Sequence, residues 1–352
     1  MLQQLIARAA LYGAALSLSF PLAACSSLDD QPPLHLPATA DAFLGESTTA
    51  DKKLWDSIKN SGLLFEKQDR NVLQEFSDFL LAQDPYEEPR KAVRSHIMKN
   101  FGAEELLVRT SDGEALSTLL FHRPNASLNI IYVTGYFAQQ TPTAEWPAPF
   151  SAIFPECNII SFDWRSFGQS SGENFSMAAK NDVAAQIAFC KTDPRLAGLP
   201  TVVVGFCIGA SIALEAIIEQ QEKENGMVPD AFAASCMLSD LANLNNGKRI
   251  RALAGNIAQS TFATIPFIRR HALNRYLGKP IQALKPAQSM TKLTIPCVLE
   301  YAATRDRFAP LSDGMECYEA AIHSPLKYLI VSAPGGHARL HKSTPVQYRN
   351  AY

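Results

Sequence analysis

The sequence has no basic run and almost no charge imbalance. Its 32 Lys and Arg residues face 34 Asp and Glu residues, which leaves a formal net charge of -2. A surface of this kind cannot neutralise many phosphates, so nucleic-acid-binding proteins are excluded as a class. The sequence also lacks a C-x-x-C pair or a Cys/His cluster, and we predict neither a metal site nor a cofactor.

Internal repeats and long low-complexity segments are also absent, which excludes solenoids and largely disordered chains. Hydrophobic residues make up 47% of the 352 residues, enough for a large buried core. We therefore expect one large domain with additions. The oligomeric state cannot be deduced from the sequence.

No apolar run near the start is long enough for a comfortable transmembrane span. The longest, residues 9–22, is typical of a signal-peptide core and ends in Leu-Ala-Ala-Cys25. This ending resembles the lipobox of bacterial lipoproteins. The resemblance implies a signal peptide over residues 1–24, a lipid with palmitate-like chains on Cys25, and a tether over residues 25–40. It also implies a protein anchored to a membrane of the bacterial cell envelope, the outer membrane in a Gram-negative cell. An uncleaved N-terminal helix or a core helix is the alternative.

Cysteine is scarce, and its spacing does not suggest a disulfide framework. Most of the thiols are predicted to be small core hydrophobes. Several thiols in an exported chain would be unusual, so either a disulfide forms or the lipoprotein prediction is wrong. The six cysteines after Cys25 are Cys157, Cys190, Cys207, Cys236, Cys297 and Cys317.

The most informative segment is Gly205-Phe-Cys207-Ile-Gly209. The β-branched residues 200–204 before it predict a buried parallel strand, and residues 210–218 after it predict a helix with a wide apolar face. A sharp turn between the two would expose the central side chain above the helix N-terminus, whose partial positive charge favours a thiolate. A buried structural cysteine in a tight turn is the alternative.

This G-x-C-x-G segment resembles the nucleophile elbow of α/β-hydrolases in its dienelactone-hydrolase form. Residues 158–170 resemble the family's strand-D-x-R-G-x-G-x-S segment, with Ser166 in place of the usual glycine and with Asp163 and Arg165 as turn-stabilising residues. The resemblance implies an α/β-hydrolase fold over residues 104–352, with a mostly parallel sheet flanked by helices. We expect a helical lid insertion at about 240–291, and a helical N-terminal extension over 41–103.

In this family the nucleophile, acid and histidine follow one another along the chain. The resemblance therefore implies that Cys207 is the nucleophile, that Asp306 after the predicted strand 295–301 is the acid, and that His337 after the predicted last strand 327–331 is the base. Glu300 is the alternative acid. His323 and His341 are rival histidines, the first expected on a helix and the second beyond the catalytic loop.

The same resemblance implies two backbone donors for an oxyanion. One is the N–H of Ile208, directly after the nucleophile, and the other belongs to the loop after the predicted strand 129–133. In that loop we select Tyr136, with Phe137 as the neighbour that could replace it.

The predicted function is hydrolysis of carboxylic esters, lactones or thioesters through an acyl-thioester intermediate on Cys207. The substrate would be a small or lipid-like acyl compound. An acyltransferase with the same Cys-His-Asp triad is one alternative, and a non-catalytic binding lipoprotein that keeps the fold is another.

Overall fold

The computed structural model describes residues 41–61, 87–135, 147–172, 175–245, 278–303, 306, 308–333, 337 and 340–351. Several predictions therefore lie outside the described residues. These are the signal peptide, lipidation of Cys25 and the tether, the oxyanion donors Tyr136 and Phe137, residues 62–86 of the helical extension, and residues 246–277 of the lid insertion.

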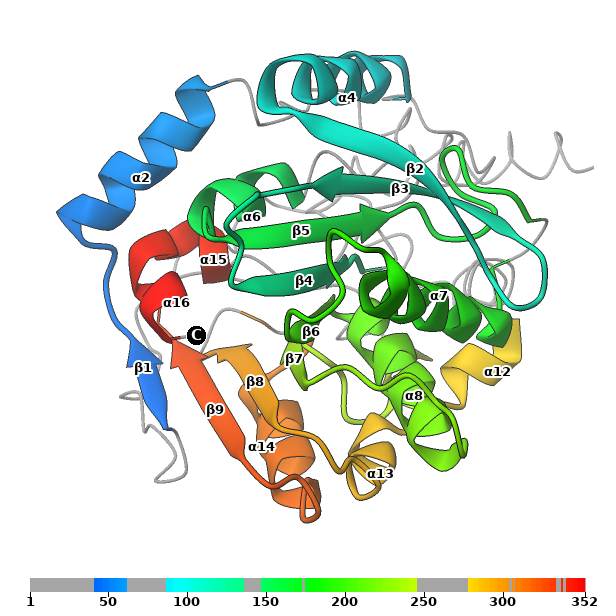
Figure 1. The fold of residues 1–352 in the computed structure, drawn as a ribbon. Helices are drawn as coiled ribbons and strands as arrows, with labels where there is room; N and C mark the ends of the chain where they lie inside the picture. Colours follow the sequence, from blue (N-terminus) through cyan, green and yellow to red (C-terminus); the bar gives the residue numbers. More distant parts are fainter. Residues whose placement is uncertain are drawn as a thin grey trace, which may run out of the picture.

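The centre of the molecule is a nine-stranded sheet in the order β1-β9-β8-β7-β6-β4-β5-β3-β2 (Figure 1). All neighbouring strands are parallel except β3 against β5 and β2 against β3. The strands are β1 (Ala42–Leu44), β2 (Ala103–Arg109), β3 (Ala115–Phe121), β4 (Leu128–Val133), β5 (Cys157–Phe162), β6 (Thr201–Phe206), β7 (Ala231–Ser235), β8 (Cys297–Ala302) and β9 (Lys327–Ser332).

The central strands are covered on both faces, as their apolar sequences predict. Every residue of β5 is buried. In each of β4 and β6, five of the six residues are buried. Two groups of helices provide this cover (Figure 1). In one group α7 (Lys180–Thr192), α8 (Ile208–Glu222), α13 (Pro286–Met290) and α14 (Leu311–Ala320) contact one another. In the other group the contacts join α2 (Thr49–Asn60), α6 (Pro147–Ile153), α15 (Leu340–Ser343) and α16 (Pro345–Ala351). None of the helices that the structure describes is long and apolar enough to cross a bilayer.

The longer helices are α2 (Thr49–Asn60), α4 (Glu87–Phe101), α7 (Lys180–Thr192), α8 (Ile208–Glu222) and α14 (Leu311–Ala320). The short ones are α6 (Pro147–Ile153), α12 (Gly278–Gln282), α13 (Pro286–Met290), α15 (Leu340–Ser343) and α16 (Pro345–Ala351), with 3₁₀ turns at Met177–Ala179 and Leu241–Asn245.

The chain reverses its direction of travel across the sheet at β4. It passes from β4 to β5 on one side, then crosses to β6 on the other side and continues to β9. In open α/β sheets the crevice outside the carboxyl ends of strands at such a switch point is the usual place for a ligand. The residues after β4 and β6 are therefore where the fold favours a site.

The segment predicted as a helical extension, residues 41–103, contributes a strand as well as helices. Residues 42–44 form β1 and extend the sheet by pairing with β9. A three-residue strand can do this because an edge strand presents unpaired N–H and C=O groups to which a further strand can bond. Such a short strand has no periodic signal of its own, which is why the sequence did not indicate it.

The helix α2 ties this N-terminal segment to the C-terminal helix α16. Asp51 closes a capping box with Thr48, and its carboxylate also accepts hydrogen bonds from the backbone N–H groups of Val346 and Gln347 at 2.8 and 3.2 Å. Asp51 is fully buried. Burial alone would raise its pKa, but the hydrogen bonds outweigh this and lower the pKa to about 2.

Candidate active site

The backbone at Cys207 is held in a strained turn between β6 and α8. Its φ of 54° and ψ of -125° lie in a region that non-glycine residues rarely adopt. Strand β6 ends at Phe206 and α8 begins at Ile208, so Cys207 is the whole connection. The predicted elbow is therefore present, with its sulfur-bearing residue at the N-terminus of a 15-residue helix.

The two glycines of the motif are required by close packing. A Cβ on Gly205 would lie 2.5 Å from Cα of Ala210, and a Cβ on Gly209 would lie 2.1 Å from the carbonyl oxygen of Thr134. Both contacts are with backbone atoms that cannot move aside cheaply. The glycines thus allow α8 to start against β6 and against the loop after β4.

The loop after β4, where the second oxyanion donor is expected, reaches the elbow. A Cβ on Gly135 would lie 3.2 Å from Cβ of Cys207, so the two backbones are adjacent there. The indole N–H of the buried Trp164 donates a 3.2 Å hydrogen bond to the carbonyl oxygen of Thr134 and fixes this loop from the other side. The backbone that precedes Tyr136 therefore lies beside the nucleophile position. Ile208, as the first residue of α8, has an N–H without a partner inside the helix.

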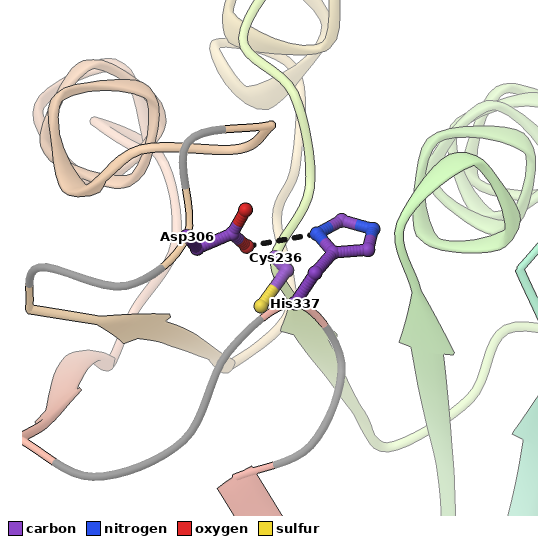
Figure 2. Close-up of side chains that lie close together, drawn as sticks. All are labelled: Cys236, Asp306 and His337. Atoms are coloured by element: carbon purple, nitrogen blue, oxygen red, sulfur yellow. Dashed lines mark hydrogen bonds and ion pairs between the residues drawn. The ribbon is translucent and has the colours of Figure 1, made fainter. Parts of the chain in front are cut away.

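Asp306 and His337 meet through a direct hydrogen bond. Nδ1 of His337 and Oδ2 of Asp306 are 2.8 Å apart (Figure 2). The other carboxylate oxygen of Asp306 accepts hydrogen bonds from the N–H groups of Phe308 and Ala309, both at 2.9 Å. These two donors orient the carboxylate, so that Oδ2 is left to bind the imidazole.

The imidazole of His337 is one-fifth exposed, whereas Asp306 is almost entirely buried. The ring of Phe308 packs edge-on against it, with 4.8 Å between the ring centroids. Burial lowers the pKa of His337, but the negative charge of a Cys207 thiolate and the hydrogen bond to Asp306 raise it more, so the pKa lies well above its ordinary value. A raised pKa favours the protonated ring, which is the form that pairs with a thiolate in cysteine–histidine pairs.

The alternative acid, Glu300, lies elsewhere. It is fully buried, accepts a 3.0 Å hydrogen bond from the hydroxyl of Tyr348, and has its pKa raised to about 8 by burial. A carboxyl group with this pKa is neutral at pH 7 and cannot stabilise an imidazolium. The structure therefore brings Asp306, and not Glu300, to His337.

The rival histidines are also separated from the pair. His341 is fully buried among the aromatic rings of Phe150, Phe206 and Tyr348, and burial keeps its pKa well below the ordinary value. His323 is exposed and lies in the connection before β9, since α14 ends at Ala320; the prediction of a helix there was wrong.

Cys236 is a residue that the sequence reasoning missed. It was expected inside a buried strand reaching residue 238, but β7 ends at Ser235 and Cys236 has a φ of 55°. Its sulfur, a carboxylate oxygen of Asp306 and a ring nitrogen of His337 lie within 4.8 Å of one another (Figure 2). The sequence feature that could have indicated it is its position directly after β7, the strand next to β6. The carboxyl ends of parallel strands lie at one edge of a sheet, so residues that follow neighbouring strands lie close together there.

These three groups have the donor types that a metal ion would need. However, the 2.8 Å hydrogen bond between Asp306 and His337 occupies two of the three ligand atoms and leaves no space for an ion between them. As they stand, the groups form an acid–base pair with a thiol beside it.

The predicted turn residues after β5 have structural roles. The guanidinium of Arg165 binds the carboxylates of Asp112 and Asp182 at 2.7 Å each. Ser166, which replaces the usual glycine, takes a φ of 63°, so it adopts the conformation for which glycine would be preferred.

A sequence profile of the α/β hydrolase family matches residues 133–349. This match spans more than half of the chain and includes Cys207, Asp306 and His337. The chain belongs to the α/β hydrolase family. The predicted α/β-hydrolase fold is thereby confirmed. No curated protein sequence matches the chain.

Solved structures support the same fold. The esterase Pf2001 of Pyrococcus furiosus superposes with a TM-score of 0.55 at 18% identity, covering 72% of this chain and 92% of that protein. A second crystal form of the esterase gives 0.55 at 19% identity, with 73% and 90% covered. At these identities the likeness concerns the fold.

Proposed function

We propose that this α/β hydrolase cleaves carboxylic esters, lactones or thioesters with Cys207 as nucleophile, His337 as general base and acid, and Asp306 as the residue that orients His337. The hydrogen bond between Asp306 and His337 carries the proposal, because it fixes the imidazole at the sheet edge where Cys207 turns out of β6. The fold likeness to an esterase is consistent with this reaction class.

In the first half of the proposed reaction the Cys207 thiolate attacks the carbonyl carbon of the substrate. The resulting oxyanion accepts hydrogen bonds from the backbone N–H groups of Ile208 and Tyr136. His337 then gives its proton to the leaving oxygen or sulfur, and an acyl-thioester remains on Cys207. In the second half His337 removes a proton from water, which attacks the thioester and releases the acid.

Cys207 is a better nucleophile candidate than Cys236, although both thiols lie beside His337. Cys207 stands at the N-terminus of α8, where helix amides stabilise a thiolate and an oxyanion. Cys236 is followed by buried residues and a bend, and it is fully buried itself. It therefore lacks both the donors and the access that an attacking group needs.

The test is turnover of p-nitrophenyl esters of graded acyl length by the full-length protein in detergent, with acid quenching and peptide mass analysis. We expect an acyl adduct on the peptide of Cys207. Turnover without any adduct there, or with an adduct on Cys236, would refute the assignment. A protein that hydrolyses none of the esters and whose Cys207 reacts with iodoacetamide no faster than its other thiols would be the non-catalytic binding lipoprotein.

An acyltransferase would use the same acyl-thioester but a different second substrate. The two reactions are separated by adding primary alcohols to the ester assay. A transferase forms the new ester in preference to the free acid, whereas a hydrolase releases the acid in proportion to water.

We also propose that residues 1–24 form a signal peptide and that lipid on Cys25 anchors the protein to a bacterial membrane. The apolar run that ends at Leu22-Ala-Ala-Cys25 supports this.

A further inference from the structure

Cys207 and Cys236 occupy equivalent places on neighbouring strands. The last paired residues of β6 and β7 are Phe206 and Ser235, so the two cysteines are the next residues on each strand. The N–H of Cys207 still donates to the carbonyl oxygen of Ser235 at 2.9 Å, as in a continuing parallel ladder. The cysteines are therefore laterally adjacent at the carboxyl edge of the sheet.

Both strands are followed by a cysteine with a positive φ, 54° at Cys207 and 55° at Cys236. Neighbouring strands lie about 4.8 Å apart, and disulfides bridge Cα atoms separated by about 4.4–6.8 Å. Residues that directly follow the last pair of two neighbouring strands are therefore expected at a Cα spacing that a disulfide can bridge.

Both sulfurs also share a single base. Cys236 lies in the cluster with Asp306 and His337, and the negative charge of a Cys207 thiolate contributes to the raised pKa of the ring, which indicates that both sulfurs lie near it. One imidazole can therefore exchange a proton with either thiol.

From this arrangement we propose that Cys207 is a site of reversible oxidation by hydrogen peroxide and that Cys236 is its resolving thiol. Cys207 is 5% exposed and Cys236 is fully buried, so peroxide reaches Cys207 first. The modification blocks the nucleophile while protecting it from irreversible oxidation. The proposal shares Cys207 with the proposed function but does not require ester turnover.

The chemistry balances in two steps. The thiolate of Cys207 attacks one oxygen of peroxide and the O–O bond breaks. Cys207 becomes a sulfenic acid, and the leaving hydroxide takes the proton of His337 and departs as water, which leaves the imidazole neutral. The thiol of Cys236 then gives its proton to His337 and attacks the sulfenic sulfur. The S–O bond breaks, the departing hydroxide takes the proton from His337, and a disulfide and water are formed.

The sequence allows a direct test, because trypsin places each cysteine in its own peptide, residues 196–223 for Cys207 and 224–248 for Cys236. The full-length reduced protein is treated with peroxide, alkylated and digested. We expect one linked species of these two peptides that has lost two hydrogen atoms and that dithiothreitol separates. Unlinked peptides, with Cys207 as sulfinic acid or still as thiol, would overturn the proposal, and so would linkage of Cys207 to any other cysteine.

The variant Cys236→Ser should leave Cys207 as a sulfenic acid that dimedone labels and that proceeds to sulfinic acid. The matched control is Cys297→Ser, which removes a buried thiol from the first residue of β8, where the parallel strands begin and not where they end. The protein with this substitution should still form the Cys207–Cys236 linked species. If Cys236→Ser fails to fold, mapping of the native chain decides alone.

The outcome is independent of the proposed function. A Cys207–Cys236 disulfide in a protein without esterase activity would support the proposed oxidation and refute the proposed hydrolysis. An active hydrolase that forms no such disulfide would support the proposed hydrolysis and refute the proposed oxidation.

Discussion

Cysteine and serine differ in how much help they need from a neighbouring base. A thiol ionises near neutral pH beside an imidazolium, whereas a serine hydroxyl is deprotonated only as it attacks. The pKa of His337 is raised despite burial, chiefly by the negative charge of a Cys207 thiolate and by the hydrogen bond to Asp306, which favours the protonated ring. The site is thus arranged for a thiolate–imidazolium pair.

We expect Cys207→Ala to lower kcat for ester hydrolysis by about 10⁴-fold or more, because the covalent route is lost. Cys207→Ser should retain a small part of the activity, since a serine hydroxyl is not ionised beforehand and must lose its proton to His337 as it attacks. Burst kinetics with p-nitrophenyl esters would measure both. Full activity in the alanine variant would mean that another residue attacks.

The hydrogen bond between Asp306 and His337 is expected to matter less than in serine enzymes. There, replacing the acid by its amide costs about 10⁴ in turnover because the wrong tautomer is favoured. We expect His337→Ala to be as damaging as Cys207→Ala, and Asp306→Asn to be clearly milder, because the thiolate itself stabilises the imidazolium. The measurement is kcat/KM of the single and combined variants. Combined losses should not exceed the worst single loss, and strictly additive losses would show that the three residues do not act as one unit.

At the scale of elements, the contact of α8 with the loop after β4 defines the site. We expect Gly209→Ala to destabilise the fold by about 3 kcal/mol or more, because the new Cβ would lie 2.1 Å from the carbonyl oxygen of Thr134. Urea denaturation measures this. Gly45→Ala is the control: its Cβ would have no neighbour nearer than 4.0 Å, so the free energy of unfolding should hardly change.

The docking of α16 on α2 gives a second prediction at this scale. Asp51→Ala should lower the free energy of unfolding by about 3 kcal/mol at pH 7, since buried N–H groups of Val346 and Gln347 lose their acceptor. Asp56→Ala, on the same helix but in an exposed pair with Lys59, should change it little.

The effect of Asp51 should depend on pH in a defined direction. The pKa of Asp51 is about 2 in the fold, below its ordinary value of 3.8, so its charged form stabilises the fold. This contribution is complete above about pH 4 and is lost as the pH falls towards 2. The difference in unfolding free energy between the native chain and Asp51→Ala should therefore be smaller at pH 3 than at pH 7. An equal or larger difference at pH 3 would contradict it.

At the scale of the whole molecule, the membrane anchor is the open prediction. Replacing Cys25 by Ala should abolish incorporation of labelled fatty acid and leave the precursor uncleaved, because the lipid is attached through this sulfur. Labelling and immunoblotting of a bacterial expression host would show it. A Cys25→Ala chain that is processed and labelled normally would overturn the anchor.

The sequence by itself determined the class of fold and indicated the three residues of the candidate site. Apolar β-branched runs such as residues 201–204 have no stable place outside a buried parallel strand. The glycines around Cys207 allow a close approach of backbones that any Cβ would block, and the order Cys207, Asp306, His337 followed from the family resemblance. Local pattern was sufficient because each of these features lies within a few consecutive residues.

Only the tertiary structure decided which polar side chains meet. Glu300 and Asp306 are both near the end of the same strand. Burial raises the pKa of Glu300 to about 8 although the hydrogen bond from Tyr348 opposes this, while two backbone amides turn Asp306 towards His337. The approach of Cys236 to this pair, and of β1 to β9, depends on the register between strands far apart in sequence. Register is set by the packing of the whole sheet, and no single segment contains it.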